Sequence, residues 1–181
     1  MIRTFRAAGK AVAASALAAS IALGGPFSGE GSAFPALATP VPATLAEQVA
    51  GSTATKTADA EQDCLANAVY FEARGEPIEG QLAVADVVLN RAASGRYPAT
   101  ICGVVTQPWQ FSFVNRSGRI PAADRSSDAW RKAVAIARIA QAGTARAVAP
   151  NVLWYHAAYV SPSWGRRLAR QDRIGLHIFY S

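Results

Sequence analysis

The chain has 181 residues, of which 51% are hydrophobic and 17% are charged, and its formal net charge is +6. These values are ordinary for a globular protein of one domain and exclude a chain that is disordered throughout. The positive charge favours non-specific attraction to an anionic surface such as a bacterial envelope, although solubility alone explains it equally well.

The beginning of the chain is typical of a secretory signal. Three basic residues precede an uncharged apolar run over residues 11–23, which is too short to span a bilayer. Ala36 and Ala38 form an A-x-A cleavage site, and the alternative site is at residues 31–33. We therefore expect a signal peptide over residues 1–38, with an uncleaved anchor as the alternative. The mature protein is expected in the periplasm or cell envelope, without stable membrane insertion.

The segment after the signal differs in composition from the rest of the chain. Residues 39–60 are rich in Ala, Thr and Pro and poor in large apolar side chains. Because such a segment buries little apolar surface, we expect a flexible linker. Residues 61–181 are numerous enough for one compact core and are expected to form a single domain.

The folded part is predicted to open with a helix over residues 61–74, which lacks Gly and Pro. Glu72 continues the apolar stripe of this helix, formed by Leu65, Ala68 and Val69. A carboxylate at the end of a buried stripe loses solvation, which raises its pKa and keeps it protonated near neutral pH. A general acid requires this property, so Glu72 is the candidate catalytic acid. A structural ion pair with an Arg is the alternative.

Three further helices are expected. Residues 78–94 are apolar nearly all round and are predicted to form the central core helix. A short helix is expected to run from a cap at Thr100 to residue 105. The last helix, over residues 128–142, is expected to begin at Ser126 or Ser127 and to end at Gly143.

The period of the sequence then changes. Residues 152–157 and 174–180 are predicted to be short strands, joined by a polar loop. A helical lobe followed by a small antiparallel sheet is an α+β arrangement, and a cleft is expected where the two parts meet.

Two cysteines, Cys64 and Cys102, lie in the part of the chain that is expected to be exported. An even count in an oxidising compartment favours one disulfide, which would close a loop of about 39 residues. Two buried free thiols are the alternative.

Several side chains could bind substrate or metal. Residues 107–113 mix amide and aromatic groups, which suits a sugar-binding cleft, although packing on the core is the commoner outcome.

The two histidines have no neighbouring ligand pattern, so we expect no metal or other cofactor. Export disfavours nucleic acid as the partner of the arginine cluster near residue 170. The candidate substrate-binding residues are Gln110, Phe111, Tyr155, His156 and Trp164.

The string CLANAVYFEARGEPIEGQLAVADVVLNR begins at Cys64, and YPATICGVV, QFSF, WYH, SWGRRL and IGLHIFY follow it. These motifs resemble the SleB-type cell wall hydrolase family, which includes the spore cortex-lytic enzymes, and they cover residues 62–180. The resemblance implies a lysozyme-like fold, action on peptidoglycan glycan strands, and a catalytic acid at the position of Glu72.

One buried carboxylic acid is enough for a lytic transglycosylase that cuts the MurNAc-β-1,4-GlcNAc bond. We expect this function for the chain, and we expect the chain to be a monomer. A muramidase would use Glu76 as a second carboxylate. Gly75 and Pro77 interrupt the helix there, so Glu76 is expected to pair with an Arg or with backbone at the start of the second helix. A peptidoglycan-binding module without activity is the remaining alternative.

Overall fold

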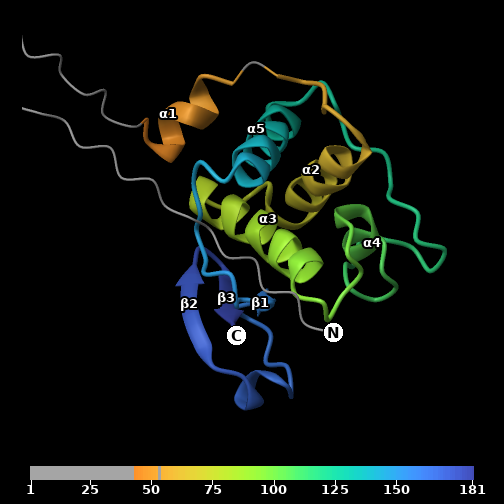
Figure 1. Cartoon of the computed structure of the whole chain (residues 1–181), viewed down its shortest axis with the longest axis vertical. Coiled ribbons are helices and arrows are strands. Elements are labelled where there is room, and N and C mark those ends of the chain that lie inside the picture. Colours follow the sequence, from red (N-terminus) through yellow and green to blue (C-terminus); the bar gives the residue numbers. More distant parts are fainter. Residues whose placement is uncertain (1–42, 53) are drawn as a thin grey trace, which may run out of the picture. The chain divides into compact units, whose positions relative to one another are not determined.

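The computed structural model describes residues 43–52 and 54–181, which are drawn in colour in Figure 1. The predicted signal peptide, residues 1–38, lies outside the described residues. The elements in chain order are α1 (Leu45–Ala50), α2 (Ala60–Ala73), α3 (Ile78–Ala93), α4 (Ile101–Val105), α5 (Asp128–Ala142), β1 (Trp154–Ala157), the 3-10 helix η1 (Gly165–Arg167), β2 (Arg170–Ile174) and β3 (His177–Tyr180). The predicted α+β class, with a small sheet near the C-terminus, is confirmed.

Three helices, α2, α3 and α5, contact one another and enclose the main core. In the view of Figure 1, α3 lies between the pair α2 and α5 and the small sheet. The expected central position of α3 is correct, because most of its residues are buried. The largest fully buried side chains of the core include Leu65, Leu82, Trp130 and Ile136.

The helices α4 and α5 begin at capping side chains that the sequence indicates, and α5 ends at the predicted glycine. The Thr100 hydroxyl accepts a hydrogen bond from the Gly103 N–H group at 3.0 Å, which caps α4. Ser127, rather than Ser126, caps α5 by accepting from the Trp130 N–H group at 3.1 Å. Gly143 ends α5 with a left-handed φ of 66°.

The sheet has the order β1-β3-β2, and both pairs are antiparallel. β3 is therefore central, with Ala157 of β1 and Ile174 of β2 both opposite His177. The sequence predicted a polar loop where β2 lies and a single strand over residues 174–180. Both predictions need correction: Ile174 ends β2, and a turn at Gly175 and Leu176 separates it from β3. β2 is almost wholly exposed, so its hydrogen bonds with β3 stabilise it, and burial contributes little.

The structure differs from the expected flexible linker over residues 39–60. The described part of this segment contains α1, which begins with a reciprocal capping box between Thr44 and Glu47. Val49 of α1 is buried, and α1 contacts α5 and α3. The linker prediction overlooked the cap, and the compact unit begins before residue 61.

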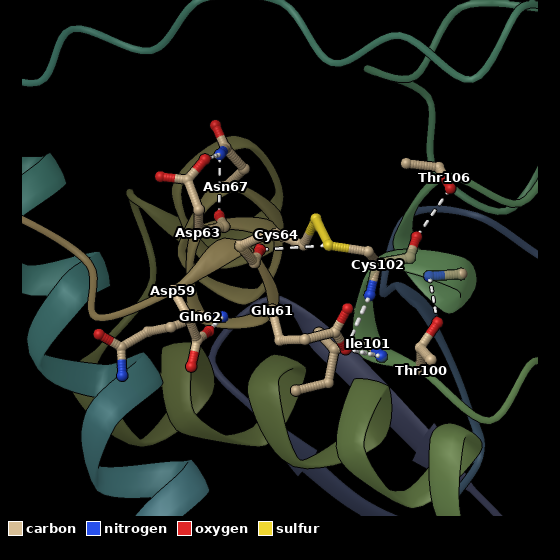
Figure 2. The surroundings of a disulfide bond; sticks show 12 residues. Asp59, Glu61, Gln62, Asp63, Cys64, Asn67, Thr100, Ile101, Cys102 and Thr106 are labelled. Carbon is tan, nitrogen blue, oxygen red and sulfur yellow. Dashed lines mark hydrogen bonds between the residues drawn. A yellow bond between two sulfur atoms is a disulfide. The ribbon is translucent and has the colours of Figure 1, made fainter.

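Cys64 and Cys102 form a disulfide between α2 and α4, with their Cα atoms 5.2 Å apart (Figure 2). Beside it, the Glu61 carboxylate accepts a hydrogen bond from the Ile101 N–H group at 2.6 Å. The two links fasten the start of α4 to the first half of α2. The segment after α4 therefore leaves from a fixed point.

Candidate active site

Glu72 lies in the last turn of α2, half-buried beside the core. The preceding residues of its stripe, Leu65, Ala68 and Val69, are completely buried. Burial raises the pKa of the Glu72 carboxyl, while a hydrogen bond from Tyr155 and the charge of Arg91 oppose this rise. Glu72 therefore has the environment that the sequence predicted for it.

A cleft of about 800 Å³ opens over Glu72, and we call it the Glu72 cleft. It lies where the helices and the sheet meet, as expected. Its walls come from α2, α3, β1, the segment after α4 and the start of β3, and its lining residues are Phe71, Glu72, Arg91, Trp109, Gln110, Phe111, Ser112, Val114, Tyr155, His156, Ala157, Tyr159, Val160 and His177. Of the described residues that line it, only Glu72 carries a carboxylate.

Tyr155 of β1 connects the sheet to Glu72. Its hydroxyl donates a hydrogen bond to Glu72 Oε2 at 3.4 Å. Burial raises the pKa of Tyr155 well above its usual value, so the phenol stays protonated and remains a donor. The geometry holds the carboxyl group in one orientation and favours its ionised form after a proton has left.

Arg91 near the end of α3 is a cleft residue that sequence reasoning did not single out. Only 6% of the residue is exposed, and its Nε–H group donates to the Leu153 carbonyl oxygen at 2.7 Å. Its guanidinium lies over the Tyr97 ring, 5.1 Å from the centroid. Its buried Nη1 has no hydrogen-bond partner among the described residues. A buried donor without a partner at the wall of a cleft is suited to a polar group of a ligand.

Glu76 does not line the Glu72 cleft. Its Oε2 accepts a hydrogen bond from the Leu176 N–H group at 2.8 Å, and only 8% of its side chain is exposed. A Cβ atom at Gly175 would lie 2.0 Å from the same Oε2, so any other residue there would displace the Glu76 carboxylate from this position. Since α2 ends at Ala73, Glu76 reaches the turn before β3 instead of the Glu72 cleft. It pairs with backbone, as expected, but with the turn between β2 and β3 and not with the start of α3.

The two histidines differ in their surroundings. Burial lowers the pKa of His177, which therefore favours its neutral form, and its Nδ1 lies 4.0 Å from Glu76 Oε1. The His156 network assigns a proton to Nδ1, which donates to the Ala157 carbonyl oxygen at 2.9 Å. Its Nε2 then accepts from the Tyr180 hydroxyl at 2.9 Å. His177 is a second cleft residue that the sequence did not assign to the site.

The predicted substrate-binding residues separate into two groups. Gln110, Phe111, Tyr155 and His156 line the Glu72 cleft. Trp164 does not: it packs edge-on against His156 and Tyr180, with ring centroids 5.6 and 5.5 Å apart. It packs against these two residues of the sheet, outside the lining of the Glu72 cleft.

Within residues 43–52 and 54–181, no three His, Cys, Asp or Glu side chains gather closely enough to hold a metal ion. In the same part of the chain, none of the helices combines the length and the apolar character that crossing a membrane requires.

The chain was compared with known proteins. Residues 75–180 match the family described as Cell Wall Hydrolase. The spore cortex-lytic enzyme of Oceanobacillus iheyensis is 58% identical over 50 residues, which are 28% of this chain and 18% of that protein. The spore cortex-lytic enzyme of Bacillus subtilis is 54% identical over 50 residues, which are 28% of this chain and 16% of that protein. The matched stretch thus spans less than a fifth of the length of these curated relatives.

Two solved structures are also similar. The catalytic domain of the germination-specific lytic transglycosylase SleB from Bacillus anthracis has a TM-score of 0.55 and 34% sequence identity, over 67% of this chain and 93% of that one. The catalytic domain of the Bacillus cereus SleB protein has a TM-score of 0.52 and 32% identity, over 72% of this chain and 97% of that one.

Proposed function

This chain belongs to the cell wall hydrolase family, and from this premise we propose that it cleaves peptidoglycan glycan strands as a lytic transglycosylase. One observation carries the proposal: Glu72 is the only carboxylate among the described residues that line the cleft, and burial raises its pKa. A raised pKa keeps the proton that the leaving oxygen must receive.

In the first step, protonated Glu72 donates its proton to the glycosidic oxygen between MurNAc and GlcNAc. The bond from this oxygen to the muramic C1 then breaks, and positive charge develops at C1. The Tyr155 hydroxyl, which donates to Glu72 Oε2, stabilises the carboxylate that remains. The neighbouring charge of Arg91 acts in the same direction.

In the second step, the Glu72 carboxylate removes the proton from the 6-hydroxyl of the same muramic acid. The freed oxygen attacks C1 and closes a 1,6-anhydro ring. Glu72 is protonated again, and no water is consumed. A single carboxyl group therefore serves as acid and then as base.

A muramidase is the second candidate, because hydrolysis by an inverting or retaining route usually employs a second carboxylate. Glu76 was the candidate for that group. Its hydrogen bond to the Leu176 N–H group and its absence from the cleft lining favour the transglycosylase instead. A binding module without activity would bind the same strands but release no fragments.

Mass spectrometry of the fragments released from purified peptidoglycan tests these candidates. Fragments that end in 1,6-anhydromuramic acid are expected. Reducing ends alone would mean that water is the acceptor, and the transglycosylase proposal would be wrong. If no fragments are released and the purified protein does not clear a peptidoglycan suspension, the binding module remains.

We also propose that residues 1–38 direct export and that the protein acts in the cell envelope as a monomer. The position of the substrate outside the cytoplasm supports this location. N-terminal sequencing of the exported protein should give a first residue near Thr39 or Phe34. An intact Met1 in the envelope fraction would instead indicate an uncleaved anchor.

A further inference from the structure

A second hollow lies beside the Glu72 cleft, with a volume of about 580 Å³. We call it the Asp63 hollow, and its lining residues are Asp63, Asn67, Phe113, Asn115, Arg119, Ile120, Pro121, Ala122, Ala123 and Arg125. Phe113 of this hollow stacks on Phe71 of the Glu72 cleft, with ring centroids 4.9 Å apart. This pair of rings is the wall that the two hollows share.

The two hollows also follow the same helix. Asp63 and Asn67 of the hollow and Phe71 of the Glu72 cleft recur every four residues, so they share one face of α2. The Asp63 hollow therefore leads along this face to Phe71 at the edge of the Glu72 cleft, and a substituent of a polymeric ligand in the cleft can extend along it.

The carboxylate of Asp63 is already fully engaged within the protein. Arg125 binds it through both terminal nitrogens, with contacts of 2.9 and 3.0 Å. The Asn67 amide donates to it at 3.0 Å, and the Thr57 hydroxyl donates to it at 3.1 Å. Asp63 thus fixes one side of the hollow and offers little negative charge to a ligand.

Arg119 provides the positive charge that a ligand in the Asp63 hollow could contact. Its side chain is exposed, and it takes part in none of the ion pairs found among the described residues. Its backbone is held from both directions by Asn115: the Asn115 N–H group donates to the Arg119 carbonyl oxygen at 3.1 Å, and the Arg119 N–H group donates to Asn115 Oδ1 at 2.8 Å. The guanidinium therefore projects from a fixed turn.

The chemistry of the hollow suits a short peptide with a carboxylate. A guanidinium pairs well with a carboxylate through parallel hydrogen bonds, and the Asn115 amide adds a further donor. The remaining wall is apolar and includes two small residues, Ala122 and Ala123, beside Ile120 and Pro121. Such a wall accommodates alanine side chains.

We propose that the Asp63 hollow binds the stem peptide of a muramic acid whose glycan strand lies in the Glu72 cleft, with Arg119 contacting a peptide carboxylate. Stem peptides are rich in alanine and carry free carboxylates, and they branch from the strand at every muramic acid. The inference rests on the proposed function, because it takes the glycan strand as the ligand of the Glu72 cleft.

The test measures binding of soluble glycan strands to the full chain by titration calorimetry, with Glu72→Gln as the background so that the strands stay intact. One set of strands retains its stem peptides. The other has been stripped by an N-acetylmuramoyl-L-alanine amidase, which leaves one lactyl carboxylate on each muramic acid. General attraction between the basic protein and an anionic strand is therefore present in both sets.

Arg119→Gln is expected to weaken binding of the peptide-bearing strands about fivefold, the upper end for an exposed charge pair, and to leave the stripped strands unaffected. The matched control is Arg167→Gln, which removes an exposed charge from η1 that lines neither hollow. Equal weakening on both sets of strands, or no weakening, would overturn the proposal. Weakening by Arg167→Gln alone would assign the peptide to the cluster around η1 instead. Binding is measured without cleavage, so a failure of the proposed enzymatic function would be seen separately in the fragment analysis.

Discussion

Gly175→Ala is expected to lower the free energy of unfolding by about 3 kcal/mol, more than the same change at the other left-handed glycines among the described residues. Gly175 occupies the turn between β2 and β3 with a φ of 56°. A Cβ atom added there would lie 2.0 Å from Glu76 Oε2. The substitution therefore has two effects. It strains the backbone of the turn, and it displaces the Glu76 carboxylate that the turn binds.

The magnitude follows from these two effects. An L-residue in the left-handed region costs about 1 to 2 kcal/mol. The carboxylate must also move away, which breaks its 2.8 Å hydrogen bond with the Leu176 N–H group. A hydrogen bond to a charged group contributes about 1.5 to 3 kcal/mol. The lower end applies because Leu176 is exposed and its N–H group regains water.

Urea denaturation of the two proteins measures the difference, and a fall in melting temperature of about 10 °C should accompany it. Gly143→Ala is the matched control, since Gly143 has a φ of 66° and an added Cβ would meet no atom within 4 Å. It isolates the backbone effect and should cost about 1 to 2 kcal/mol. The excess at Gly175 is then the contribution of the contact with Glu76.

Equal losses for Gly175→Ala and Gly143→Ala would refute this reasoning. The double variant Gly175→Ala with Glu76→Ala provides a second check. Without the carboxylate, Gly175→Ala should cost the backbone amount and only the smaller contact with Pro77 Cδ, which would lie 3.0 Å from the added Cβ, so the two substitutions should be strongly non-additive. Simple additivity would show that the close approach has no energetic consequence.

Three further changes should alter activity or stability. Glu72→Gln should reduce the release of fragments by about 10²-fold or more. It should also raise the melting temperature at neutral pH but not at acidic pH, because the folded-state pKa of Glu72 is raised and the wild type loses stability as the pH rises through it. Tyr155→Phe removes a hydrogen bond that lowers the pKa of Glu72, so the fall of kcat/KM on the alkaline side should move to higher pH. Replacing Cys64 and Cys102 by Ser should lower the free energy of unfolding by about 4 kcal/mol in urea denaturation, as expected for a closed loop of this length; an unchanged midpoint would argue against that contribution.

The helical part of the fold could be predicted because each helix carries its own signals. Periodic apolar residues, a capping side chain such as Thr100 and a final glycine such as Gly143 lie close together in the sequence. α1 was not predicted because only a short capping box marks it. β2 was not predicted because its residues are charged and exposed, and because its hydrogen bonds to β3 are no property of its own sequence.

The residues of the candidate site also divide into those that one helix identifies and those that depend on how distant elements pack. Glu72 could be singled out because its position on an apolar stripe is a property of α2 alone. Arg91 and His177 could not, because they reach the cleft only when α3 and β3 pack against α2 and β1. The direction of Glu76 depends on a turn 100 residues later in the chain. Trp164 has the residue type expected for a sugar site, but packing behind β1 decides its position.

The strand order has a consequence for the moment at which the cleft is assembled. β1 and β2 both hydrogen-bond to β3, which is the last of the three strands in the chain. A chain that emerges vectorially, N-terminal end first, presents its helices before β3 is available. Until β3 arrives, Tyr155 has no sheet to hold its hydroxyl against Glu72, and His177 is missing from the cleft wall. Nascent chains therefore carry Glu72 without the groups that orient it, and the Glu72 cleft is complete only after β3 has paired with β1.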